Sequence, residues 1–303
     1  ATLKRLEGAY ALAFIFTDAS DSIFAARMGP PLAIGHGDGE MYVGSDAIAL
    51  SHLTRRITYL EDGDWAEVKA SGIVIMNAEG EKVNRPVVES NIDAGATERG
   101  PYHHFMQKEI FEQPAVVAET LKIYTDPLSL TLRLPDIPLD LSAFARVQIV
   151  ACGTSFYAAN VAKYWFEVIA PTPTDIDIAS EYRYRSPILS ADTLTIVISQ
   201  SGETADTLAV LRHAQSISPV LAIVNVKEST IAREASAVLY TYAGPESGVA
   251  STKAFTTQLA TLALLALALS EARNTQTEQQ RKDLLQHLLE APALMTQILH
   301  LDT

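Results

Sequence analysis

Two short stretches of the chain concentrate small polar residues that can bind an anion. One is Cys152-Gly153-Thr154-Ser155, and the other is Ser199-Gln200-Ser201-Gly202-Glu203-Thr204. Hydroxyl and amide groups are neutral hydrogen-bond donors, and glycine lets backbone N–H groups approach a ligand closely. Such donors can hold a phosphate dianion without a lysine or arginine against a substrate that must also react. The two stretches are therefore candidate phosphate-binding loops.

A third stretch has a similar composition and precedes a long apolar segment. Its sequence is Glu246-Ser247-Gly248-Val249-Ala250-Ser251-Thr252-Lys253. Ser251 and Thr252 can cap the following helix, or they can contact a sugar hydroxyl or a phosphate. Lys253 can point toward an anion or toward solvent, and the sequence leaves both open.

A simpler interpretation competes with ligand binding at the second loop. Ser201 or Thr204 can serve only as a helix cap, with Glu203 favourable in the first turn. For one loop alone this interpretation is preferred, but a second loop of the same kind favours a shared ligand. Cys152 is interpreted as a strand-end residue, because no basic side chain lies nearby in sequence to stabilise a thiolate.

The elements around these loops alternate between strand and helix. Strands are predicted at 147–152, 175–179, 194–199, 220–224 and 238–242, and helices at 156–169, 181–185, 205–215, 230–235 and 252–272. This alternation is typical of a parallel sheet with helices on both faces. Ligands of such folds lie beyond the carboxyl ends of the strands, where helix N-termini carry partial positive charge. The loops should therefore meet at one edge of the sheet.

The rest of the chain has other patterns. Residues 1–90 are predicted to form a mainly antiparallel layer with few helices, starting with a hairpin made by 9–16 and 22–27. Residues 91–102 are polar and contain Gly95, Gly100 and Pro101, which indicates a linker. Pro114 is predicted to separate two consecutive helices. A final helix is predicted over 277–301.

Composition excludes several classes of protein. Among 303 residues the net charge is −13, which argues against nucleic-acid binding. A single cysteine excludes an internal disulfide or a cysteine metal cluster, and the seven histidines lack helical metal-ligand spacing, so no metal site is expected. Residues 1–8 do not resemble an export signal, and the apolar segment 259–269 is shorter than a membrane span. A cytoplasmic location without membrane contact is expected.

The three loops together resemble the glutamine:fructose-6-phosphate aminotransferases (isomerising), also called glucosamine-6-phosphate synthases. The third motif extends through Ala254-Phe255-Thr256-Thr257-Gln258. Phe105-Met106-Gln107-Lys108-Glu109-Ile110 resembles the start of the isomerase half of that family. Thr54-Arg55-Arg56 and Leu60-Glu61-Asp62-Gly63-Asp64 resemble the late part of its glutaminase domain. The resemblance extends nearly from end to end.

The resemblance implies a fold and a division into domains. Residues 1–90 would be the C-terminal part of a type 2 glutamine amidotransferase domain, an α+β domain of the N-terminal-nucleophile (Ntn) kind. Residues 91–102 would be a linker. Residues 103–303 would be the first sugar-isomerase (SIS) module with the helices that lead into it, an α/β parallel sheet sandwiched by helices.

The resemblance also implies an activity and a set of binding residues. In that family, ammonia from glutamine is used to convert fructose 6-phosphate to glucosamine 6-phosphate without metal or organic cofactor, in a homodimer. The positions matching the phosphate-binding residues are Ser155, Ser199, Gln200, Ser201 and Thr204. The positions matching the sugar-contacting residues are Thr154, Val249 and Ser251.

The chain departs from the family pattern at the catalytic positions. It begins with Ala1 and has no cysteine before Cys152, whereas the family's glutaminase nucleophile is an N-terminal cysteine. The family's isomerase catalytic groups lie in or after a second SIS module. The expectation is therefore an internal segment that binds phosphosugar, contains no catalytic residue and is inactive alone. A non-catalytic SIS-domain phosphosugar sensor is the alternative, and a purely structural assembly element is a third possibility.

Overall fold

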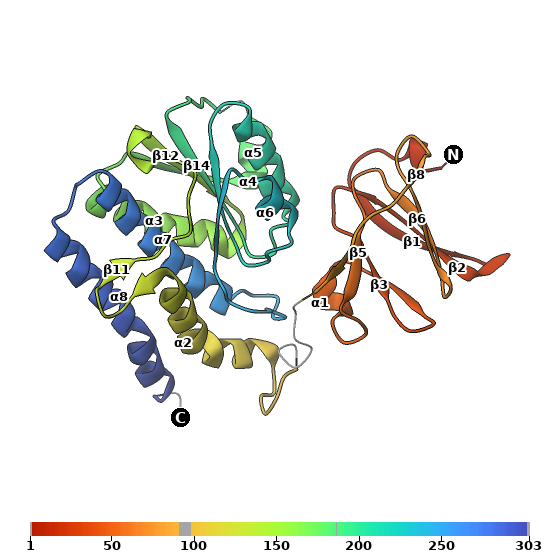
Figure 1. Cartoon of the computed structure of the whole chain (residues 1–303), viewed down its shortest axis with the longest axis horizontal. Helices are drawn as coiled ribbons and strands as arrows, with labels where there is room; N and C mark the ends of the chain where they lie inside the picture. Colours follow the sequence, from red (N-terminus) through yellow and green to blue (C-terminus); the bar gives the residue numbers. More distant parts are fainter. Residues whose placement is uncertain (1, 91–97, 186, 302–303) are drawn as a thin grey trace. The chain divides into compact units, whose positions relative to one another are not determined.

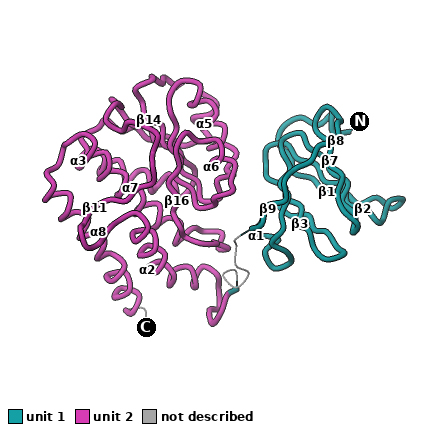
Figure 2. The backbone as a smooth tube through the Cα atoms, viewed as in Figure 1, with its two compact units in different colours: residues 1–98 teal, residues 99–303 magenta. Residues whose placement is uncertain are grey.

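The computed structural model describes residues 2–90, 98–185 and 187–301 (Figure 1). The chain divides into two compact units, Ala1–Glu98 and Arg99–Thr303 (Figure 2). Most of the predicted linker, residues 91–97, lies outside the described residues.

Unit 1 contains two antiparallel sheets. One has the strand order β1-β2-β6-β7-β8 and the other β4-β3-β5-β9. The strands are β1 (Tyr10–Phe16), β2 (Ala19–Met28), β3 (Ala33–His36), β4 (Met41–Gly44), β5 (Arg56–Tyr59), β6 (Trp65–Lys69), β7 (Gly72–Met76), β8 (Lys82–Val83) and β9 (Val87–Glu89), with a 3-10 turn η1 (Leu3–Arg5) and helix α1 (Ala47–Leu50). The predicted first hairpin is confirmed, since β1 pairs antiparallel with β2.

Unit 2 is built on a five-stranded, all-parallel sheet. Its order is β13-β12-β14-β15-β16, with β12 (Arg146–Ala151), β13 (Thr174–Ile178), β14 (Thr193–Ser199), β15 (Val220–Val224) and β16 (Ala237–Tyr240). Each neighbouring pair is parallel. All seven residues of the central strand β14 are buried, because helices cover both of its faces. The predicted parallel α/β fold is confirmed.

Two groups of helices cover the two faces of this sheet (Figure 1). On one face, α3 (Gly153–Ile169) and α7 (Lys253–Ala272) pack with Ile149 and Ile196 into the larger core. On the other, α4 (Ala179–Tyr182), α5 (Ala205–Gln215) and α6 (Thr230–Glu234) pack with Val150 and Val197. The alternation of side chains along a strand therefore divides the core into two layers.

The helices α2 (Phe105–Tyr124) and α8 (Glu278–Leu299) lie outside this sandwich, and α2 contacts both α7 and α8. Two small elements follow α2: the antiparallel pair β10 (Thr125–Asp126) with β11 (Thr131–Leu132), and the 3-10 turn η3 (Leu141–Ala143). Helix α7 is long and apolar enough to cross a membrane, yet 72% of the 18-residue stretch that meets this criterion is buried within the protein. Its apolar surface is thus used in the core of unit 2.

The predicted break at Pro114 is wrong, because α2 continues through the proline. A proline inside a helix removes one N–H and leaves the carbonyl four residues earlier without its usual donor. That carbonyl belongs to Ile110, and it accepts a hydrogen bond from the side-chain amide of Gln113 at 3.0 Å. The neighbouring glutamine therefore replaces the missing donor, and burial of Val117 and Leu121 stabilises the second half of the helix.

Candidate functional site

The carboxyl ends of the adjacent strands β12 and β14 open into a hollow of about 360 Å³. Its lining comes from three segments separated by up to about 100 residues in sequence: Cys152, Gly153, Thr154, Ser155, Ile198, Ser199, Gln200, Ser201, Thr204, Val249, Ala250 and Ser251. All eight residues predicted to bind a phosphosugar are in this set. The structure thus places them together, and their contacts with a ligand remain a prediction.

The first candidate loop is the first turn of a helix. The helix was predicted to start at Phe156, but α3 starts three residues earlier at Gly153, whose φ is +56°. Glycine accepts this left-handed geometry readily, so the chain turns sharply from strand into helix. No side chain caps this end of α3, and its first turn has no acidic residue. Its unpaired N–H groups are therefore available to an anion at the hollow.

The second loop is held in shape by its own hydroxyl groups. The Ser199 hydroxyl accepts a hydrogen bond from the backbone N–H of Gly202 at 3.0 Å and lies 2.8 Å from the Thr204 hydroxyl. The Ser201 hydroxyl accepts from the N–H of Glu203 at 3.1 Å. Thr204 is the N-cap residue of α5, but its side chain makes no capping hydrogen bond. A capping role therefore does not explain why a hydroxyl-bearing residue occupies position 204.

Glu203 has a role that the sequence did not predict. It precedes α5 instead of lying in its first turn, and its carboxylate accepts a hydrogen bond from the N–H of Thr230 at 2.7 Å. The carbonyl of Gly202 accepts from the N–H of Ile231 at 3.0 Å. The second loop is thereby anchored to the start of α6. No sequence signal identifies these contacts, because the partners lie 27 residues apart.

The third loop leads into α7 and is closed by a carboxylate. Glu246 accepts hydrogen bonds from the N–H groups of Thr252 at 2.8 Å and Ala254 at 3.1 Å, so it caps α7 in place of the Thr252 side chain. The Ser251 hydroxyl is buried and has no hydrogen-bond partner among the described residues. A buried hydroxyl without a partner is costly, which marks Ser251 as a candidate for a hydrogen bond with a ligand.

Lys253 points away from solvent and toward a carboxylate of the protein itself, not toward the hollow. It is 3% exposed, and its ammonium group lies 2.7 Å from the carboxylate of Glu112 on α2. None of the residues that line the hollow carries a charged side chain. Attraction for an anion must therefore come from backbone N–H groups, hydroxyls and helix N-termini.

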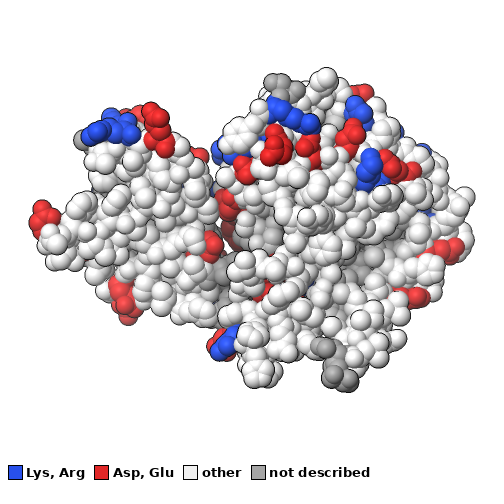
Figure 3. All heavy atoms as spheres, turned by 180° about the vertical axis from the view of Figure 1, so that it is seen from behind, with Lys and Arg blue, Asp and Glu red and all other residues white. Residues whose placement is uncertain are grey.

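One face of the molecule shows no broad basic area that would attract an anion (Figure 3). Figure 3 shows one face of the molecule, where acidic and basic side chains are interspersed and neither sign forms a continuous patch. Among the described residues, no three His, Cys, Asp or Glu side chains are grouped as metal ligands. The charged side chains on this face therefore form no extended basic surface (Figure 3).

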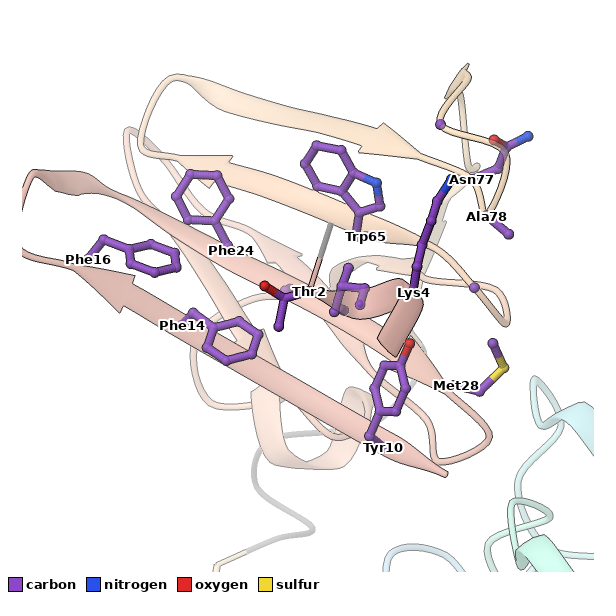
Figure 4. A pocket seen from close by; sticks show the side chains of 15 residues that line it. Thr2, Lys4, Tyr10, Phe14, Phe16, Phe24, Met28, Trp65, Asn77 and Ala78 are labelled. Atoms are coloured by element: carbon purple, nitrogen blue, oxygen red, sulfur yellow. The ribbon is translucent and has the colours of Figure 1, made fainter. Parts of the chain in front are cut away.

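Unit 1 carries a larger hollow of a different character, with a volume of about 550 Å³. Figure 4 shows Phe14, Phe24 and Trp65 on one face of the sheet formed by β1, β2 and β6. Its lining is mainly apolar and lacks a cluster of hydroxyl donors. We therefore place the candidate functional site in unit 2.

Sequence comparison identifies the fold around that site. Residues 141–268 match the SIS domain. The chain is 53% identical over 294 residues to the glutamine–fructose-6-phosphate aminotransferase (isomerizing) of Zymomonas mobilis, covering 97% of this chain and 48% of that protein. Its identity to the enzyme of the same name from Mesorhizobium japonicum is 52% over 301 residues, covering 99% and 50%. The chain spans about half the length of the curated relatives it matches.

A solved structure supports the same relationship. The C-terminal domain of glucosamine-fructose-6-phosphate aminotransferase from Francisella tularensis matches with a TM-score of 0.63 and 40% identity, covering 65% of this chain and 56% of that chain. The resemblance predicted from the three loops is confirmed. The chain therefore contains a SIS domain and is homologous, along nearly its whole length, to about half of a glutamine–fructose-6-phosphate aminotransferase.

Proposed function

We propose that this chain is the phosphosugar-binding part of an enzyme that uses glutamine to convert fructose 6-phosphate to glucosamine 6-phosphate. The observation that carries the proposal is the gathering of all eight predicted binding residues around one hollow at the ends of β12 and β14. The names of relatives about 50% identical favour an enzyme over a phosphosugar sensor. The activity belongs to the complete protein, and this chain supplies substrate recognition.

The phosphate would lie where the N-termini of α3 and α5 converge. The groups proposed to bind it belong to Ser155, Ser199, Gln200, Ser201 and Thr204. Two helix N-termini and several hydroxyls can stabilise a dianion without a cation. The sugar would extend toward Thr154, Val249 and Ser251, where the unpaired Ser251 hydroxyl offers a hydrogen bond.

No catalytic residue is proposed in the hollow. Its lining offers hydroxyl, amide, thiol and backbone groups, and it lacks the carboxylate, lysine and imidazole groups that most often transfer protons in enzymes. The lining can bind and orient the substrate. Unit 1 is proposed to be the late part of the glutaminase domain, supported by its antiparallel sheets and by similarity to the relatives across its length. A cytoplasmic location is part of the same proposal, and the single free cysteine suits a reducing compartment.

Substituting a hydroxyl of the second loop tests the proposal. Ser201→Ala and Thr204→Ala should each weaken fructose 6-phosphate binding by about 1.5 to 3 kcal/mol, because each removes a hydrogen bond to a charged group. Isothermal titration calorimetry measures this change. Ser216→Ala, which removes an exposed hydroxyl at the other end of α5, is the matched control and should bind as the unaltered chain does. A folded, unaltered chain that binds neither fructose 6-phosphate nor glucosamine 6-phosphate would refute the proposal.

A homodimer is the second part of the proposal, and α3 offers a surface for it. Tyr157, Val161, Tyr164 and Val168 are exposed at a spacing of four, three and four residues, which places them in one stripe. If two copies of this helix pack antiparallel about a twofold axis, every tyrosine faces a valine of the other copy. This pairing of large with small side chains suits a self-complementary interface.

Tyr164→Glu should convert the dimer to a monomer, because it places a charge at the centre of that stripe in each copy. Light scattering coupled to size-exclusion chromatography measures the mass. Tyr184→Glu, at another exposed tyrosine of unit 2, is the control and should leave the mass unchanged. An unchanged mass for Tyr164→Glu would exclude α3 as the interface.

A further inference from the structure

The carboxylate of Glu109, on helix α2, contacts the backbone of the third loop. The Oε1 atom of Glu109 accepts hydrogen bonds from the backbone N–H groups of Ser247 at 2.6 Å and Gly248 at 2.9 Å. Glu109 is 2% exposed and lies 138 residues before Ser247. Two consecutive peptide groups are thus held by one buried carboxylate, immediately before Val249.

Gly248 is the residue that permits this contact. A Cβ at this position would lie 2.5 Å from Oε2 of Glu109 and 3.4 Å from its Cδ. Its φ is not in the left-handed region, so glycine is required here for close approach and not for backbone conformation. The fit between the glycine and the carboxylate fixes the path of the loop.

The same helix holds the far end of the loop. Glu112, one turn after Glu109, pairs with Lys253 at 2.7 Å, and Lys253 is the first residue of α7. Between these two attachment points lie Val249 and Ser251, which line the hollow. Glu109 and Glu112 themselves are absent from the lining.

We infer that Glu109 is a positioning residue for the sugar end of the site. It touches no part of the hollow, and it acts by fixing residues 247–251 so that Val249 and Ser251 face the ligand. This inference rests on the proposed phosphosugar function. Its consequence is selective: loss of the carboxylate should weaken recognition of the sugar. Recognition of phosphate by the first turns of α3 and α5 should stay intact, because Glu109 has no hydrogen bond to either helix among those found in the described residues.

Two variants test the inference. Glu109→Gln keeps the size of the side chain and removes the charge that strengthens its bonds to N–H groups. Gly248→Ala keeps the carboxylate and displaces the loop. The matched control is Glu119→Gln, the same change at an exposed position of α2 whose carboxylate contacts Lys122. Affinities for fructose 6-phosphate and for inorganic phosphate are measured on each by titration calorimetry.

Both test variants should bind fructose 6-phosphate about tenfold or more weakly. Their affinity for inorganic phosphate should stay within about twofold of that of the unaltered chain, which is a small change in the free energy of binding. The control should match the unaltered chain for both ligands. The ratio of the two affinities is informative even if a variant folds poorly, because unfolded molecules lower the stoichiometry and leave the ratio unchanged.

Other outcomes separate the inference from the proposed function. If the unaltered chain binds fructose 6-phosphate and both variants bind it equally well, the inference is wrong and the function stands. Equal losses for fructose 6-phosphate and inorganic phosphate would also overturn it, because the effect would then be a general disturbance of unit 2. If the folded, unaltered chain binds neither ligand, the proposed function itself fails.

Discussion

Gly202→Ala is expected to abolish measurable phosphosugar binding and to destabilise unit 2 by about 2 to 5 kcal/mol. The φ of Gly202 is +66°, a conformation that other residues adopt only at a cost. A Cβ there would lie 2.0 Å from the hydroxyl and 2.5 Å from the Cβ of Ser229. Ser229 cannot easily move, because its hydroxyl donates to the carbonyl of Val226 at 2.7 Å and caps α6. The second loop must therefore shift.

Gly100→Ala separates the two causes of this effect. Gly100 is exposed and has a φ of +60°, and a Cβ added at this position would have no atom within 4 Å outside residues 99–101. This control should lose only about 1 kcal/mol of stability, the cost of a side chain in a left-handed backbone conformation. It should bind phosphosugar normally. Thermal unfolding and titration calorimetry of both variants measure the two effects. Normal phosphosugar binding by Gly202→Ala would contradict the close contact between the second loop and α6.

Ile196→Ala is expected to reduce the free energy of unfolding of unit 2 by about 2 to 5 kcal/mol. Ile196 is fully buried at the middle of β14, the central strand, and packs in the core shared with α3 and α7. Truncation removes three carbon atoms and leaves a cavity that the neighbouring helices cannot fill without moving. Denaturant unfolding measured by circular dichroism and fluorescence gives the change.

Ile188→Ala is the matched control for this loss. It is the same substitution at a side chain that is 97% exposed, so its effect should stay within about 0.5 kcal/mol. Equal effects of the two variants would show that β14 is not at the centre of the core. Because β14 ends at the second loop, Ile196→Ala should also lower the temperature at which phosphosugar binding is lost.

Much of unit 2 could be predicted from the sequence because its signals are local. Four of the five strands are short, mainly apolar runs, the edge strand β13 being the exception, and the helices that follow have their own periodicity. The rule that such units form right-handed parallel crossovers then leaves few arrangements. Both candidate loops follow strand ends on the same edge of such a sheet, and in the structure β12 and β14 are neighbours. The hollow could therefore be anticipated from residue order and composition.

Unit 1 was less predictable because several of its strands are short. β8 and β9 contain two and three residues, and β5 contains four. Such segments are too short to show a pattern of their own. β5 forms because β3 and β9 pair with it on either side. Its existence depends on partners that are distant in sequence.

The sequence by itself determined the parallel sheet, the three polar loops and the residue types suited to a phosphosugar. Only the tertiary structure decided how the loops are held: Glu109 against Gly248, Glu112 against Lys253, and Glu203 at the start of α6. It also decided that α2 continues through Pro114, since a side-chain amide replaces the missing donor. The reason is physical. Strand and helix signals come from neighbours along the chain, whereas a buried carboxylate or carbonyl is satisfied by whichever donor the fold brings near it.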